Sequence, residues 1–157
     1  MSAAPPTPAA VRALAEALDL LAEVFLVPSA DVRARAAALV GSGPWPDPEL
    51  DELARPLRTL SAAEPDGTGT EYARLFLHGR PVTAHPYESF YRSGELGDGE
   101  CLAELAALLD AAGVTPDAGH PVAPDHLGVE LDLLALLMHG VAVPGLGRGQ
   151  AEQLRAL

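Results

Sequence analysis

Apolar residues in the first third of the chain recur every three or four positions, which is the spacing of one face of an α-helix. A first helix is predicted to begin at Thr7, as its N-cap, with Pro8 in the first turn, and to end at Pro28. Ser29 can cap a second helix, which the Gly/Pro-rich run from Gly41 ends. A third helix follows, because four leucines then share one face: Leu50, Leu53, Leu57 and Leu60.

The middle of the chain combines one further helix with a long segment of helix breakers and aromatic residues. Thr68 and Glu71 have the spacing of a capping box, which predicts the start of a fourth helix that contains Tyr72 and Phe76. Residues 78–99, which follow, are too rich in Gly and Pro for a helix and too aromatic for a plain linker. We therefore predict an ordered functional loop over these residues.

Helical spacing returns in the last third of the chain. It predicts a helix over residues 100–112 with Gly113 as its C-terminal cap. A Pro/Gly-bearing loop, residues 114–124, then leads to a helix over residues 125–139, whose apolar stripe is broad enough for full burial. The glycines of residues 140–149 are expected to break this last helix.

Composition supports the helical interpretation and narrows the choice of partner. The apolar residues are mostly Ala, Leu and Val, Ile is absent, and aromatic residues make up only 4%, a mixture that favours helices over strands. All ten basic residues are Arg, and the formal net charge of −12 disfavours a nucleic-acid partner and favours a cationic one. We predict an all-α, single-domain helical bundle of about six to seven helices over residues 1–157.

The location of the protein is predicted from its cysteine content and its termini. Cys101 is the only cysteine, so no internal disulfide forms and a reducing compartment is favoured. Residues 1–10 lack the charged and apolar regions of a secretory signal, and no apolar run reaches the roughly 18 residues that span a membrane. We expect a cytoplasmic protein without stable membrane insertion. A thiol at a helix start can have a lowered pKa, but without identifiable partners we interpret Cys101 as a spectator.

Two segments of the second half carry more information than helical periodicity. The first contains E-Y-A-R-L-F at residues 71–76 and P-Y-E-S-F-Y at residues 86–91, and the second is P-D-H-L-G-V-E-L-D-L-L at residues 124–134. At these residues the chain resembles the TorD/DmsD/NarJ family of redox-enzyme maturation chaperones, whose pattern combines E-Y-x-x-L-F, P-x-x-S-x-Y and a later D-H-(L/I)-x-x-E-L helix. The order of the two segments makes the resemblance more specific than either segment alone.

The resemblance implies an all-helical chaperone, not an enzyme, that binds the twin-arginine signal peptide or the apoprotein of a molybdopterin-dependent oxidoreductase until its cofactor is inserted. It places the ligand-binding pair on Asp125 and His126. Family members usually add helices beyond this pair, whereas the sequence stops at Leu157. Three alternatives follow: the chain is a short, monomeric variant, it obtains the missing helices from a partner copy in an exchanged dimer, or its C-terminus is truncated. The family's loop positions fall on Pro86, Tyr87, Ser89 and Tyr91.

The chemistry of such a ligand can also be argued from the residues. A twin-arginine signal offers two guanidinium groups followed by an apolar helix, so its receptor needs carboxylates beside an apolar groove. Asp125, Glu130 and Glu88 supply carboxylates, and the aromatic residues of the range 87–91 supply apolar surface. The predicted binding site comprises Pro86, Tyr87, Glu88, Ser89, Tyr91, Asp125, His126 and Glu130.

Three of these residues also have structural interpretations. Asp125 follows Pro124 at the predicted helix start, so it can be an N-cap that accepts backbone hydrogen bonds. His126 can be a helix-start residue that is bonded to nearby backbone. Tyr91 can pin the loop against the bundle, which is the interpretation we favour for its ring.

A second functional hypothesis rests on His126 and Glu130, whose spacing of four on one helix also suits a metal ion. Such a site needs further ligands, and His85 and His120 lie at no diagnostic spacing. The alternative to a chaperone is therefore a small metal- or ligand-dependent helical enzyme that uses His126 and Glu130. No phosphate loop, nucleophile elbow or H-E-x-x-H motif is present, so no cofactor and no metal are predicted.

Overall fold

The structure is a computed structural model that describes residues 7–26, 31–41, 48–63, 67–77, 84–114 and 122–142. These residues form α1 (Pro8–Leu26), α2 (Val32–Gly41), α3 (Pro48–Ala62), α4 (Gly67–Tyr72), which continues as the π-helical segment η1 (Ala73–Leu77), α5 (Glu88–Ser93), α6 (Gly99–Ala111) and α7 (Leu127–Ala142). The all-α prediction is confirmed. Among the described helices, none combines the length and the apolar character that crossing a membrane requires.

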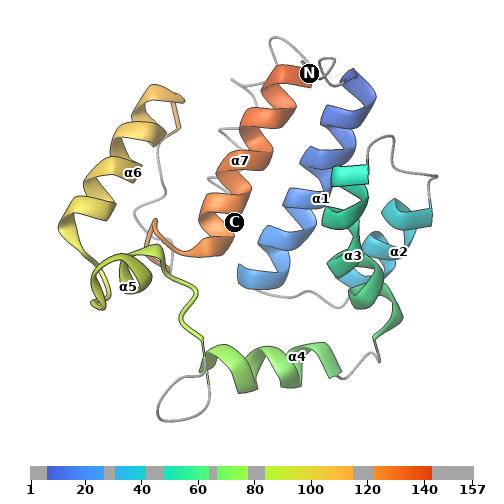
Figure 1. The fold of residues 1–157 in the computed structure, drawn as a ribbon, viewed down its shortest axis with the longest axis horizontal. Helices are drawn as coiled ribbons and strands as arrows, with labels where there is room; N and C mark the ends of the chain where they lie inside the picture. The colour runs from blue at the N-terminus through green and yellow to red at the C-terminus, as the bar shows by residue number, and fades with distance from the viewer. Residues whose placement is uncertain are drawn as a thin grey trace.

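Helices α1 and α7 form an antiparallel pair at the centre of the fold, although they lie at opposite ends of the sequence (Figure 1). Small residues let their backbones approach closely. Ala22 and Ala135 are buried, and a Cβ atom on Gly128 would lie only 3.1 Å from the carbonyl oxygen of Ala22. Further along the pair, Nε2 of His139 lies 2.8 Å from Oδ2 of Asp19. The start of α7 is thus held against the end of α1.

Helices α2 and α3 pack against a second face of α1 (Figure 1). The Thr7 cap predicted for α1 is confirmed, because the Ala10 N–H donates to Thr7 Oγ1 over 3.2 Å. Pro28 and Ser29, the predicted boundary between α1 and α2, lie outside the described residues. The core that the three helices share consists of Ala17, Leu20, Val32, Ala36 and Leu57.

Helix α6 packs against α7 through a separate apolar cluster. The predicted C-terminal cap is confirmed, since Gly113 has a φ of 69° and its N–H donates to the Asp110 carbonyl over 2.9 Å. The next N–H, from Val114, donates to the Leu109 carbonyl over 2.9 Å, which completes a Schellman motif. This turn directs Val114 into the cluster, which consists of Leu105, Leu109, Val114, Leu133 and Leu136.

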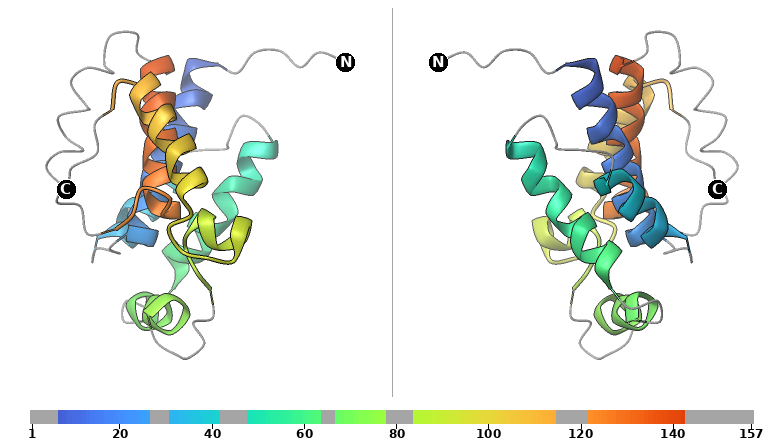
Figure 2. Two further views of the ribbon diagram at one scale, coloured as in Figure 1. Left: turned by 90° about the vertical axis from the view of Figure 1, so that its left-hand side faces the viewer. Right: turned by 90° about the vertical axis from the view of Figure 1, so that its right-hand side faces the viewer.

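Helix α4 lies at one end of the molecule, near the C-terminal end of α1 (Figure 2). The hydroxyl of Tyr72 donates to the Phe25 carbonyl over 2.9 Å, and the rings of Phe25 and Phe76 meet edge to face at 5.7 Å. Tyr72 and Phe76 therefore anchor this segment to the end of α1. The predicted capping box is wrong: α4 begins at Gly67, and the Glu71 carboxylate pairs with Arg74 over 2.5 Å.

The last helix differs from its prediction in three respects. It begins at Leu127 and runs through Gly140 to Ala142, so Gly140 itself does not end it, and residues 143–149 of the predicted break lie outside the described residues. A helical glycine is tolerated there because the preceding turn is anchored to α1 through His139. The apolar stripe is not fully buried either, since Leu134 and Leu137 are 41% and 44% exposed. One face of α7 is therefore open among the described residues.

Candidate functional site

Two segments that are distant in sequence meet where α5 and α7 begin. Their backbones pair through an isolated antiparallel bridge, and the Glu88 N–H donates to the Asp125 carbonyl over 2.9 Å. We call this region, formed by residues 86–91 and 125–130, the α5–α7 junction. It brings all eight residues of the predicted site into one part of the molecule. The predicted loop over residues 78–99 is wrong for residues 88–93, which form α5.

Asp125 caps α5 from the neighbouring segment. The residue is 0% exposed, and its Oδ2 accepts hydrogen bonds from the Ser89 N–H over 3.3 Å and from the Ser89 hydroxyl. The same hydroxyl accepts the Gly97 N–H over 3.0 Å. The prediction that Asp125 caps its own helix is therefore wrong, because it lies two residues before α7 and satisfies the start of α5 instead. This remote cap explains a helix where local sequence predicts a loop.

His126 has the role at α7 that was expected of Asp125. Its Nδ1 accepts the Gly128 N–H over 3.1 Å, so the ring caps the helix and the imidazole proton is on Nε2. The ring is 3% exposed and meets the Tyr87 ring edge to face at 5.0 Å. The structural interpretation of His126, a helix-start residue bonded to nearby backbone, is confirmed.

Glu130 lies in the first turn of α7, next to two other carboxyl groups. Its pKa is raised to about 7, first by burial and then by the charge and hydrogen bond of Glu88 and the charge of Asp125. Its Oε1 is buried, and within the described part of the chain no hydrogen-bond partner reaches it; the same holds for Oδ1 of Asp125. The junction therefore concentrates negative charge with unused acceptor oxygens.

Cys101, in α6, lies beside the carboxyl group of Glu88. Burial raises the pKa of the thiol, and a hydrogen bond with Glu88 and the charge of Glu88 act in the same direction. The possibility of a lowered thiol pKa is therefore wrong. Arg92 lies 3.4 Å from Glu88 but pairs more closely with Glu104, at 2.6 Å. Glu88 is thus only weakly compensated by its own cation.

Pro86 and Tyr91 complete the predicted site in different ways. Pro86 contributes backbone, because its carbonyl accepts the Leu127 N–H over 2.7 Å. Tyr91 is 68% exposed and touches the half-buried Phe90 edge to face at 5.5 Å, so the favoured interpretation that its ring pins a loop is wrong. Phe90 stacks instead against His85, with ring centroids 3.9 Å apart. Tyr91 therefore presents an aromatic ring to solvent beside the carboxyl groups.

The metal-dependent alternative finds no third ligand in the described residues. No three His, Cys, Asp or Glu side chains there are grouped closely enough to hold an ion. His85 stacks on Phe90, and His126 uses Nδ1 to cap α7. His120 lies outside the described residues. Within the described part of the chain, His126 and Glu130 are therefore not joined by the further ligands that a metal site needs.

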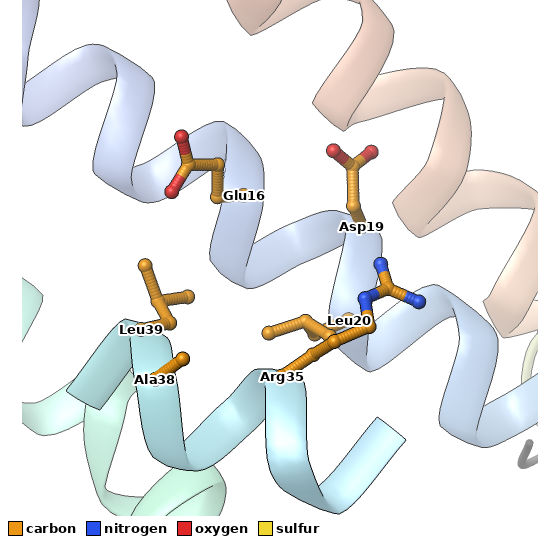
Figure 3. Close-up of a pocket in the computed structure, with 6 residues that line it drawn as sticks. All are labelled: Glu16, Asp19, Leu20, Arg35, Ala38 and Leu39. Atoms are coloured by element: carbon orange, nitrogen blue, oxygen red, sulfur yellow. The ribbon is translucent and has the colours of Figure 1, made fainter. Parts of the chain in front are cut away.

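A hollow of about 400 Å³ between α1 and α2 was not predicted from the sequence (Figure 3). Two of its charged groups are engaged elsewhere, because Asp19 lies 2.8 Å from His139 and Arg35 pairs with Glu23. No motif marks the hollow, since its residues have ordinary helical spacing on two separate helices. It is lined by Glu16, Asp19, Leu20, Arg35, Ala38 and Leu39.

The comparison with protein families favours the chaperone hypothesis. The family model described as nitrate reductase delta subunit matches residues 46–153, which include the whole α5–α7 junction. The chain belongs to the nitrate reductase delta subunit family. This family comprises NarJ/TorD-type maturation chaperones of redox enzymes, not enzymes, and it implies a molybdoenzyme as the partner. The resemblance seen in the sequence is therefore confirmed.

A solved structure supports the fold of this nitrate reductase delta subunit family member. It is similar to the crystal structure of a proposed redox enzyme maturation protein from Archaeoglobus fulgidus, with a TM-score of 0.58 and 24% sequence identity. The match covers 90% of this chain and 91% of the other. No curated protein matches the sequence. At this identity the structural likeness supports the helical architecture and no further property.

Proposed function

We propose that the protein is a cytoplasmic chaperone that holds the twin-arginine signal peptide, or an adjoining segment of the apoprotein, of a molybdopterin-dependent oxidoreductase until its cofactor is inserted. The family supplies the class of function. The observation that carries the finer assignment is Glu130, whose Oε1 is buried without a partner among the described residues while Glu88 and Asp125 lie nearby. An arginine guanidinium is the natural ligand for such a group.

The chemistry of the guanidinium supports this choice. Its planar fork donates to two acceptor oxygens at once, and it is more weakly hydrated than an ammonium group, so it enters a half-buried site at lower cost. Hydrogen bonds to charged groups contribute about 1.5–3 kcal/mol each. The partial positive charge at the start of α7 opposes a cation by only about 0.3–1 kcal/mol. Attraction by Glu130 and Glu88 therefore exceeds the opposing helix dipole.

The eight residues of the predicted site divide by their contacts into two groups. Pro86, Ser89, Asp125 and His126 hold the junction together through hydrogen bonds and are proposed as positioning residues. The groups proposed to touch the ligand are exposed or half-buried, and they are Tyr87, Glu88, Tyr91 and Glu130.

The proposal is tested by isothermal calorimetry with a synthetic peptide that carries two adjacent arginines followed by an apolar stretch. Glu130→Gln keeps the shape of the side chain and removes its charge, so we expect about tenfold weaker binding. Glu88→Gln should have a similar effect. Glu95→Gln is the matched control, because Glu95 is exposed and its substitution changes the net charge by the same amount.

A lysine pair in place of the arginine pair should also bind more weakly, because an ammonium group cannot donate as a planar fork. Equal effects of Glu95→Gln and Glu130→Gln would contradict the assignment, since the peptide would then respond only to overall charge. An affinity that neither Glu130→Gln nor Glu88→Gln changes would also contradict it.

A further inference from the structure

Among the residues that the structure describes, helix α7 has one open face, and this face combines charge with apolar surface. Its other faces are occupied: Gly128 and His139 meet α1, while Leu133 and Leu136 pack against α6. The open face carries residues spaced by four and then three positions, which places them in one row along a helix. The row consists of Glu130, Leu134 and Leu137. We call it the α7 row.

The order of the α7 row matches the order of groups in the proposed ligand. Its acidic end, Glu130, lies at the start of α7 beside Glu88. Its apolar end is accessible, because Leu134 and Leu137 are 41% and 44% exposed. A helix rises 1.5 Å per residue, so Leu137 lies about 10 Å further along the axis than Glu130. A peptide with arginines first and an apolar helix after them has the same two zones at a similar separation.

We infer that the apolar helix of the signal peptide lies along the α7 row, parallel to α7, with its arginine pair at Glu130 and Glu88. This inference rests on the proposed function and adds the binding face and the direction of the ligand. The reversed peptide would place its guanidinium groups beside Leu137, about 10 Å from Glu130, which exceeds the screening length of about 8 Å at physiological salt. Only the parallel direction joins the charges and the apolar surfaces at the same time.

Leucine variants test the face. Leu134→Ser and Leu137→Ser each remove a half-exposed apolar side chain that the peptide would cover, and each should weaken binding of an Arg-Arg peptide with about 12 Leu and Ala residues about fivefold. Leu108→Ser is the matched control, because Leu108 is an exposed leucine of α6 outside the α7 row. It should leave the affinity unchanged.

The direction in which the peptide lies along α7 is tested with the unmodified protein. A peptide of the same composition with its arginines after the apolar stretch should bind at least tenfold more weakly. A photoreactive benzoylphenylalanine placed about seven residues after the arginine pair should crosslink to the part of α7 that contains Leu134 and Leu137. Crosslinks to any other helix would overturn the inference.

The outcomes separate this inference from the proposed function. If Glu130→Gln weakens binding while Leu134→Ser and Leu137→Ser behave like Leu108→Ser, the α7 row is not the binding face and the proposed function stands. If neither the Glu130 nor the leucine variants affect the peptide, both are wrong. Equal affinity for the forward and reversed peptides overturns the proposed direction.

Discussion

A methyl group on Gly128 would probe the contact that holds the start of α7 against α1. A Cβ atom there would lie 2.6 Å from Cγ of Leu26 and 3.1 Å from the carbonyl oxygen of Ala22, both closer than ordinary van der Waals contact. The Leu26 side chain can shift, but the Ala22 oxygen belongs to the backbone of α1. Gly128→Ala must therefore move α7 away from α1 or distort its first turn.

The magnitude follows from a comparison within the same helix. Replacing a helical glycine by alanine stabilises a helix by up to about 1 kcal/mol, whereas overpacking costs about 1–3 kcal/mol. At Gly140 a Cβ atom would meet no described atom within 4 Å, so Gly140→Ala has the gain without the clash. Both variants have this gain in helix stability, so it largely cancels when their free energies of unfolding are compared. Gly128→Ala should therefore be about 1–3 kcal/mol less stable than Gly140→Ala.

Urea unfolding followed by far-ultraviolet circular dichroism measures this difference, provided that both variants unfold with the same denaturant dependence. Gly128→Ala should unfold at lower urea than Gly140→Ala. If both alanines raise the stability equally, α7 does not approach α1 as closely as the 3.1 Å separation indicates, and the argument is refuted.

Two further predictions concern the junction. Glu130 has a folded pKa of about 7 and an unfolded value near 4.5, so the folded state binds more protons between these values and loses stability as the pH rises through them. Glu130 is partly exposed, so solvent screening reduces this effect. Glu130→Gln should raise the free energy of unfolding by about 1–2 kcal/mol at pH 8 and by little at pH 4.5. A gain in stability that does not depend on pH would contradict this prediction. Ser89→Ala removes a hydrogen bond to the buried Asp125 carboxylate and should cost about 1.5–3 kcal/mol in thermal or urea unfolding, whereas Ser93→Ala, at an exposed position, should cost less than about 1 kcal/mol. Equal costs for the two serines would show that the Asp125 contact contributes nothing.

The helices that could be predicted from the sequence are those whose signals are local. Thr7 caps α1 within one turn, and Gly113 ends α6 within two residues, so spacing and residue type suffice for both. Helix α5 could not be predicted, because the group that caps it, Asp125, lies in another segment. The role of Gly128 was missed for a related reason. This glycine allows α1 to lie close to α7, and no local sequence pattern indicates a contact between distant helices.

The residues of the candidate site could be predicted from the sequence, but their separate roles, as ligand-binding or positioning residues, could not. Asp125 and Glu130 are both acidic residues of the same motif and looked equivalent as ligands for arginine. Burial separates them, because Asp125 is fully buried and its Oδ2 is bound by Ser89, whereas Glu130 is half-buried. Tyr91 was expected to pack against the bundle, but its ring is exposed.

The environment of Glu130 destabilises the ionised carboxylate and favours a cationic ligand. A half-buried carboxyl group whose pKa is raised to about 7 makes the fold less stable above that pH, and glutamine at this position would remove the repulsion from Glu88 and Asp125. Groups that cost stability and can be replaced without loss of shape are typical of functional sites. A ligand that brings positive charge to Glu130 would reverse this cost, since the ionised form would then be favoured. Glu130→Gln is therefore expected to stabilise the free protein at pH 8 while weakening its binding of the arginine peptide, a combination that a purely structural carboxylate would not produce.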